Sequence, residues 1–205
     1  MIKHDFRISP DVGEGRKFGV EIEAVYARAL NVPPWGLTRE GEGIEFVSPP
    51  LQGINGLNTV RNLYALAYPV FDDSCGVHVH IDIRDHNDHE RLNLVRQFVA
   101  TKQHWFDYVD PKRLRNRYCY NDLPEVKGTW QDYYSQFIMY HPADRYYWLN
   151  LYSIRKYGTI EMRLHEATIN VEKVIVWVRT LVEFVTKVKN NEDYTDLFWF
   201  YNLVR

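Results

Sequence analysis

The sequence lacks the features of a membrane protein, of a disulfide-rich secreted protein and of a nucleic-acid-binding protein. No apolar run approaches the roughly 20 residues that a membrane-spanning helix needs, and the first residues do not form a signal peptide. Only two cysteines are present, Cys75 and Cys119, without the spacing of a metal motif. A formal net charge of −2 gives no electrostatic reason to bind nucleic acid or an anionic membrane. We therefore expect a cytoplasmic protein with reduced thiols.

Aromatic residues, by contrast, are abundant. The 205 residues include 15 Tyr, 10 Phe and 6 Trp, and such side chains bury large areas and often line pockets. The sequence shows no internal repeat, linker or low-complexity segment. We therefore predict a single domain over residues 1–205.

The stretch from Phe18 to Val25 predicts a strand with one apolar and one acidic face. Successive side chains of a strand point to opposite faces, so Glu21 and Glu23 share the face opposite the apolar residues. Their positions are about 6.6 Å apart along the strand. Neighbouring carboxylates repel each other, and either water screens them or a cation holds them.

Three further stretches, 43–48, 75–83 and 158–165, repeat this alternation of an apolar and a polar face. Their apolar faces predict contacts with helices. The polar side chains of the four strands are then expected on one common open face: Glu21, Glu23, Glu45, His78, His80, Asp82, Thr159, Glu161, Arg163 and His165.

The remaining chain predicts helices and one more strand, without the strict alternation of a parallel α/β fold. We predict a loop over 31–43, a strand over 148–154 that ends in a turn near 156–158, and helices over 54–67, 88–106, 171–189 and 194–203, whereas 107–147 shows no clear pattern. The fold class that follows is α+β, with a curved and mainly antiparallel sheet packed on helices.

The open face is unusual because Glu and His dominate it. A single Glu-x-Glu pair is more often a solvated face, and a single His-x-His strand is at least as often structural. Four such strands together make a cluster that is costly unless cations neutralise it. Carboxylates with a little imidazole suit Mg²⁺ or Mn²⁺ better than Zn²⁺.

The sequence contains no GxxxxGK[ST] phosphate loop. Magnesium held by few protein ligands normally implies a phosphate partner. Any nucleotide would then be held by metal ions, arginines and aromatic stacking. Arg163, with Arg155 or Arg117, could bind phosphate oxygens in a bidentate manner.

In chain order, the stretches FGVEIE, IEFVSPPL, CGVHVHID and YGTIEMR resemble the putative amidoligase enzymes, a branch of the carboxylate–amine ligases with the glutamine synthetase-like fold. The resemblance runs from about Phe18 to the helix after Arg163. It implies a glutamine synthetase-like catalytic domain that uses ATP and Mg²⁺ to join a carboxylate to an amine through an acyl phosphate. Small-molecule or peptide acids and amines are the implied substrates. The resemblance is compatible with assembly into a homo-oligomer.

The resemblance also implies a role for each matching residue. The implied metal ligands are Glu21, Glu23, Glu45, His78 and Glu161. The implied catalytic residues are Glu23, His78, Glu161 and Arg163. Arg163 and His80 match groups that face the nucleotide phosphates.

The chain departs from the family of glutamine synthetases at one point. Those enzymes carry Arg-x-Glu-x-Arg on this strand, and the first position is Thr159 here. The phosphate site is therefore expected to use Arg155 or Arg117 as well. Two other functions stay open: a metal-dependent hydrolase that uses the His and Glu residues to activate water, and a non-catalytic binding module on the same fold.

For several polar residues we favour a structural interpretation. Asp82 is as well suited to orient a neighbour as to bind metal. We expect His165 and Glu166 to support the structure or the site, and His86 and His89 to lie in solvent. We expect the basic run 112–117 to form a solvated turn, in which Arg117 is best suited to bind an anion.

Overall fold

A computed structural model of the chain describes residues 15–40, 43–116, 119–120, 123–140 and 146–200. Its centre is a six-stranded sheet in the order β3-β4-β1-β6-β8-β7, and all neighbouring strands are antiparallel. The strands are β1 (Phe18–Ala24), β3 (Gly36–Glu40), β4 (Gly43–Val47), β6 (Gly76–Asp82), β7 (Leu149–Asn150) and β8 (Thr159–Glu166). Two short strands, β2 (Tyr26–Ala27) and β5 (Pro69–Val70), form a separate pair.

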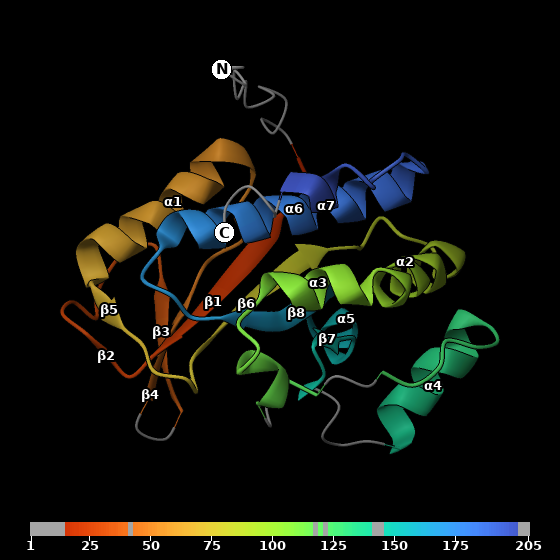
Figure 1. Cartoon of the computed structure of the whole chain (residues 1–205), viewed down its shortest axis with the longest axis horizontal. Helices are drawn as coiled ribbons and strands as arrows, with labels where there is room; N and C mark the ends of the chain where they lie inside the picture. The colour runs from red at the N-terminus through yellow and green to blue at the C-terminus, as the bar shows by residue number, and fades with distance from the viewer. Residues whose placement is uncertain (1–14, 41–42, 117–118, 121–122, 141–145, 201–205) are drawn as a thin grey trace.

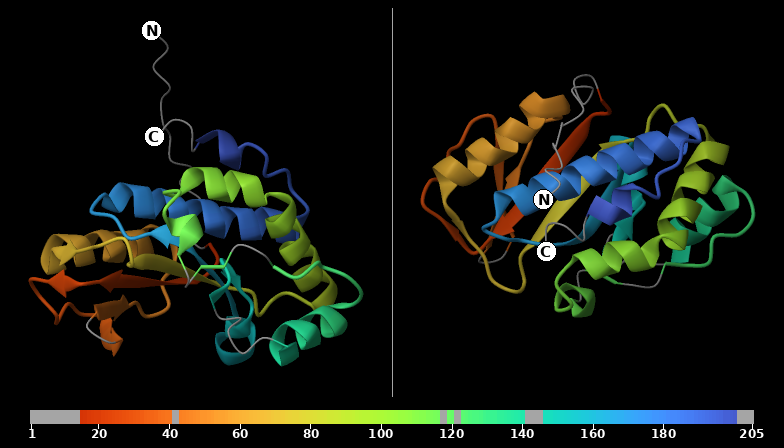
Figure 2. Two further views of the ribbon diagram at one scale, coloured as in Figure 1. Left: turned by 60° about the horizontal axis from the view of Figure 1, so that its bottom comes forward. Right: turned by 45° about the horizontal axis from the view of Figure 1, so that its top comes forward.

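Helices lie on both sides of the sheet, and the longest helices cover one face. Figures 1 and 2 show α1 and α6 across one face, with α4 and α5 on the other side. The helices are α1 (Gly53–Ala67), α2 (Asp88–Ala100), α3 (Lys102–Tyr108), α4 (Trp130–Tyr140), α5 (Tyr152–Tyr157), α6 (Val171–Asn190) and α7 (Leu197–Phe200), with a 3-10 turn η2 (Arg113–Arg115). None of the helices in these described ranges is long and apolar enough to cross a bilayer.

The core lies between the sheet and the helices α1 and α6. On β6, Val77, Val79 and Ile81 are fully buried, as the alternation predicts. Opposite them, α6 buries a stripe that includes Val178 and Leu181, which is the helical spacing of an amphipathic face. The predicted antiparallel sheet packed on helices is confirmed, and the predicted helices 54–67 and 171–189 differ from α1 and α6 by a single residue at one end.

Three predicted elements were wrong, each because a local contact overrides the pattern. The predicted loop 31–43 contains β3, which pairs with β4 as a hairpin, so its glycines and prolines lie mostly at the ends of the strand. The predicted helix 88–106 is interrupted at Thr101, whose hydroxyl donates to the carbonyl of Gln97. The predicted strand 148–154 is short, because the Asn150 side chain accepts from the backbone N–H of Tyr152 and turns the chain into α5.

A β-bulge changes the faces of β8 near its end. Two steps along β6, from Val77 to Val79, correspond to three steps along β8, from His165 to Met162. The extra residue inverts the alternation, and His165 lies fully buried on the helix side of the sheet. There its ring centroid is 5.2 Å from that of Trp177 in α6. The prediction that His165 shares the open face with Glu161 was therefore wrong.

One other polar group is less exposed than the sequence suggests. His86 was predicted in solvent, but it is buried and its Nδ1 lies 2.8 Å from a carboxylate oxygen of Asp85. His89 is exposed, as predicted. The cysteines Cys75 and Cys119 are buried and free, as expected of structural thiols.

Candidate metal and nucleotide site

Strand register brings the acidic and imidazole side chains together on the open face of the sheet. Glu21 of β1 lies opposite His78 of β6, and Glu23 lies opposite Glu45 of β4. His80 of β6 lies opposite Glu161 of β8. Like charges directly opposite each other are destabilising, so the Glu23–Glu45 pair is unfavourable without a compensating positive charge.

His78 lies at the middle of the cluster and is 1% exposed. Its Nδ1 is 3.3 Å from Glu21 Oε2, 3.9 Å from Glu45 Oε1 and 3.9 Å from Glu161 Oε1. Its Nε2 is 3.6 Å from Glu23 Oε1, and this buried nitrogen has no hydrogen-bond partner within the described part of the chain. The imidazole of His78 thus lies close to all four carboxylates. A cation bound between these groups could draw them closer together.

His80 is held from two sides. Its Nε2 is 3.2 Å from Glu21 Oε1 and 3.9 Å from Glu161 Oε2, and its Nδ1 is 3.0 Å from the hydroxyl of Thr159. The ring of Tyr157 meets the imidazole edge-on, with 5.8 Å between centroids. These contacts direct Nε2 toward the carboxylates.

Charge coupling within the cluster shifts three pKa values. Burial opposes the charge of Glu21, but hydrogen bonds with His78 and His80 hold the pKa of this carboxyl far below its usual range. Burial also opposes the charge of His80, yet its hydrogen bond with Glu21 and the charge of Glu161 raise the imidazole pKa. Burial, together with the charge of Glu21, raises the pKa of Glu45. The cluster therefore favours positive charge at its centre.

Glu161 is fixed by two donors. Asn150 Nδ2 donates to Glu161 Oε2 at 2.6 Å, and Arg163 Nη1 donates to Oε1 at 2.6 Å. Burial works against the charge of Arg163, but the neighbouring carboxylate of Glu161 raises the pKa of the guanidinium. Glu161 is 4% exposed, so its carboxylate is oriented by both donors and shielded from solvent.

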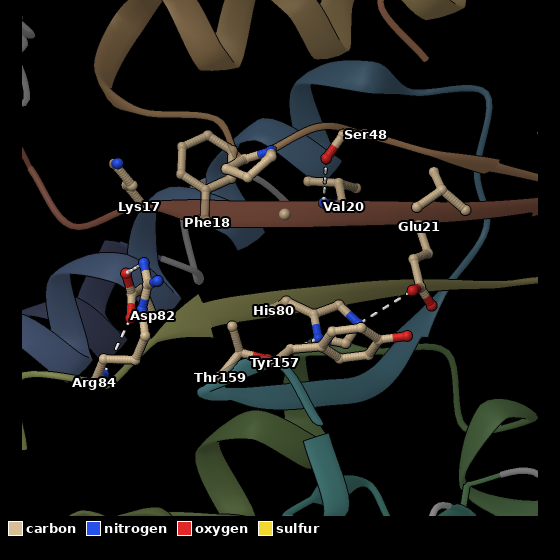
Figure 3. A pocket seen from close by; sticks show the side chains of 13 residues that line it. Lys17, Phe18, Val20, Glu21, Ser48, His80, Asp82, Arg84, Tyr157 and Thr159 are labelled. Carbon is tan, nitrogen blue, oxygen red and sulfur yellow. Dashed lines mark hydrogen bonds and ion pairs between the residues drawn. The ribbon is translucent and has the colours of Figure 1, made fainter. Parts of the chain in front are cut away.

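A cavity of about 310 Å³ adjoins this cluster. Figure 3 shows Glu21 and His80 at one end of it and Lys17, Asp82 and Arg84 at the other. Its apolar lining includes Pro50, Val47 and the ring of Tyr157. Asp82 binds Arg84, with 2.5 Å between Oδ2 and Nη2. It therefore orients a neighbouring side chain, which is one of the two roles that the sequence suggested for it.

The structure gathers most of the predicted site residues and separates others. Those in contact within the cluster are Glu21, Glu23, Glu45, His78, His80, Glu161 and Arg163. Arg155 is exposed on α5, where its charge acts on the phenol of Tyr134. Within the described part of the chain, no ion pair joins it to the acids, and its phosphate role stays a prediction. Arg117 lies outside the described residues.

Three residues of the site were missed by the sequence analysis. Asn150 supports Glu161, and only its isolated polar character between apolar neighbours could have indicated it. Thr38 donates to Glu45 Oε2 at 2.9 Å and lies in the segment predicted as a loop. Arg113 belongs to the run predicted as a solvated turn, but it is 2% exposed and donates to the carbonyl of Arg163.

The donor set fits one or more divalent cations. Two groups offer three converging ligand atoms each, Glu21 with Glu45 and His78, and Glu21 with His80 and Glu161, with all atoms of a group within 4.8 Å. The unpartnered Nε2 of His78 adds a further donor near Glu23. Three oxygens or nitrogens of this kind leave coordination positions for water or phosphate, as Mg²⁺ and Mn²⁺ prefer.

Comparisons with known proteins identify the family of the chain. No curated protein and no solved structure matches the chain significantly. The sequence profile of the family described as "Putative amidoligase enzyme" matches residues 40–185. The matched range includes Glu45, both histidines of β6, and Glu161 with Arg163, whereas β1 lies before it. Because the match covers more than half of the 205 residues, the chain belongs to this putative amidoligase family.

Proposed function

We propose that the protein is an ATP- and Mg²⁺-dependent carboxylate–amine ligase, built as a glutamine synthetase-like catalytic domain with a curved sheet. One observation carries the proposal: four carboxylates from three strands converge on two imidazoles of a fourth strand beside a cavity, in a chain of the amidoligase family. Family membership supports ligase chemistry, and the acidic cluster supports the use of Mg²⁺ with a phosphate substrate.

In this proposal the residues of the cluster divide into ligands and supports. Glu21, Glu45 and His78 hold one cation, and Glu21, His80 and Glu161 can hold a second. Bound Mg²⁺ neutralises the charge that develops on the transferring phosphoryl group. Burial keeps these ligands in place before the substrates bind, which reduces the reorganisation needed during the reaction.

The cavity is the proposed place for the nucleotide. The flat ring of Tyr157, with Pro50, offers an apolar surface for a base, while Glu21 and His80 lie at the end where phosphates and Mg²⁺ would meet. Lys17 and Arg84 lie at the other end. This arrangement replaces the glycine-rich phosphate loop that the sequence lacks.

The proposed reaction has two steps. A carboxylate oxygen of the acid attacks the γ-phosphorus of ATP, and the bond between this phosphorus and the β-phosphate oxygen breaks. The products of this step are an acyl phosphate and ADP. The amine nitrogen then attacks the acyl carbon, the phosphate leaves and the nitrogen loses a proton. We propose that Arg163 steadies the transferring phosphoryl group and that Glu23, 27% exposed, accepts the proton.

Thermal unfolding tests this proposal directly. We expect Mg²⁺ with a non-hydrolysable ATP analogue, at 100 times the dissociation constant, to stabilise the protein by about 2.7 kcal/mol, a rise of roughly 5 to 10 °C in Tm. Neither component alone should give this rise. Glu23→Ala should leave the fold intact and abolish ADP formation, whereas the matched surface variant Glu125→Gln should behave like the native protein.

The two other functions predict different results. Hydrolysis that depends on Zn²⁺ or Mn²⁺ and proceeds in the absence of ATP would favour the metal-dependent hydrolase. A binding module predicts that simultaneous replacement of Glu21, Glu23 and Glu161 leaves the biological effect unchanged. Continued ADP formation by Glu23→Ala would contradict the role given to that carboxylate.

A further inference from the structure

The guanidinium of Arg113 occupies a place on the open face of β6 where a side chain would normally lie. His80 and His78 of β6 point to this face, and by alternation the next position toward the start of the strand is Gly76. A Cβ atom on Gly76 would lie 2.0 Å from Arg113 Nη2 and 2.7 Å from its Cζ. A side chain at position 76 would therefore displace the guanidinium that reaches this space from η2.

Arg113 also binds the bulge of β8. Its Nη2 donates to the carbonyl of Arg163 at 3.1 Å, and its Nη1 donates to the carbonyl of Ser74 at 3.3 Å. Arg163 lies in the segment where β8 carries its extra residue. A bulge interrupts the hydrogen-bond ladder and leaves backbone groups that need other partners. The planar fork of arginine can serve both carbonyls at once.

The backbone that Arg113 holds also carries contacts of the candidate site. The N–H of Gly76 donates to Glu23 Oε2 at 2.6 Å. The side chain of Arg163, whose carbonyl Arg113 binds, donates to Glu161. The charge of Arg113 itself faces Glu23, Glu166 and Arg163. One buried guanidinium thus connects the start of β6, the bulge of β8 and two carboxylates of the cluster.

We propose that Arg113 is a positioning residue, which holds the bulge of β8 and the first residue of β6 so that Arg163 and Glu23 keep their orientation in the site. This proposal extends the proposed function. The experiment that measures metal binding rests on that function, whereas the experiment that measures packing does not. It assigns a role to a residue that touches neither the cavity nor the two groups of metal-ligating atoms.

A double-mutant cycle tests the packing without any ligand. Gly76→Ala should lower the Tm of the native protein by several degrees, because its methyl group meets the guanidinium. In an Arg113→Ala background the same change should shift the Tm by less than about 1 °C, since the space is then free. An equal shift in both backgrounds would overturn the proposal.

Binding of Mn²⁺ alone, measured by titration calorimetry, tests the positioning. We expect Arg113→Ala to weaken Mn²⁺ binding about tenfold, as for other groups that orient metal ligands, and millimolar methylguanidinium to restore it where methylammonium does not. If the alanine variant does not fold, Arg113→Lys replaces it in this test. Lysine keeps the charge but cannot bond both carbonyls in one plane, so Arg113→Lys should also weaken Mn²⁺ binding. The exposed neighbour serves as control in Arg115→Ala.

The outcomes separate this proposal from the proposed function. Unchanged Mn²⁺ binding in Arg113→Ala and Arg113→Lys overturns the positioning role. A native protein that binds no Mn²⁺ overturns the metal site itself, and the thermal cycle then still decides whether Arg113 fills the space at Gly76.

Discussion

Strands β6 and β8 pair with each other and both contribute to the candidate site, but only β6 follows its sequence pattern to the end. On β6, strict alternation directs His78 and His80 to the open face. On β8, the same alternation holds at Glu161, and then the bulge moves His165 into the helix-side core. A period of two predicts the face of a side chain only while the ladder stays in register.

The largest expected effect tests the two sides of the bulge. Glu161→Gln should weaken Mn²⁺ binding by at least about 100-fold, because it removes a buried ligand charge and leaves Arg163 without its partner. Glu166→Gln lies beyond the bulge, where the carboxylate binds Lys173, and should change the affinity by less than about twofold. Calorimetric titration with Mn²⁺ measures both, and similar losses in the two variants would contradict the separation.

The second prediction concerns the buried His165. Burial lowers the pKa of this imidazole to about 4, below the value of about 6.5 in an unfolded chain. Between these values the unfolded chain binds the proton and the native protein does not, so stability is full above pH 6.5 and falls as the pH drops toward 4. The full loss attributable to this group is about 3 kcal/mol.

Urea unfolding at pH 7, 6 and 5 measures this loss. His165→Phe keeps an aromatic ring beside Trp177 and removes the titrating group, so its stability should fall less steeply over this range. Parallel curves for the native protein and the variant would show that the imidazole is not kept neutral in the core.

The third prediction compares the start of β8 with its partner on β6. Thr159→Val should weaken Mn²⁺ binding about tenfold, because the valine cannot accept the hydrogen bond from His80 Nδ1 that directs Nε2 to the carboxylates. Thr159→Ser keeps the hydroxyl and should bind nearly as the native protein does. Equal affinities for all three proteins would rule out this support.

The smallest effect lies at the turn before β8. Gly158 has a φ of 70° and ends α5, and a Cβ there would lie 2.4 Å from Arg84 Cγ. Gly158→Ala should therefore lower stability by about 1 kcal/mol, which is a Tm decrease of roughly 2 to 4 °C. Gly36→Ala is the matched control, because a Cβ at Gly36 meets only ordinary contact distance.

Local patterns along the chain were enough to identify which residues could form the site. Alternation within 18–25, 43–48 and 75–83 predicted the acidic and imidazole face correctly, because local sterics of an extended chain direct successive side chains to opposite faces. The family motifs FGVEIE and CGVHVHID then indicated a ligase. The sheet and the helices that cover it followed from the same local periodicities.

How these residues meet depends on contacts between segments that are far apart in the chain. The register of β1, β4, β6 and β8 brings Glu21, Glu45 and Glu161 around His78, and register depends on pairing between distant segments. Asn150 is 11 residues before Glu161, which it binds, and Arg113 is 50 residues before Arg163, whose carbonyl it binds. The bulge that buries His165 arises from pairing with β6, so no periodicity within 158–165 could reveal it.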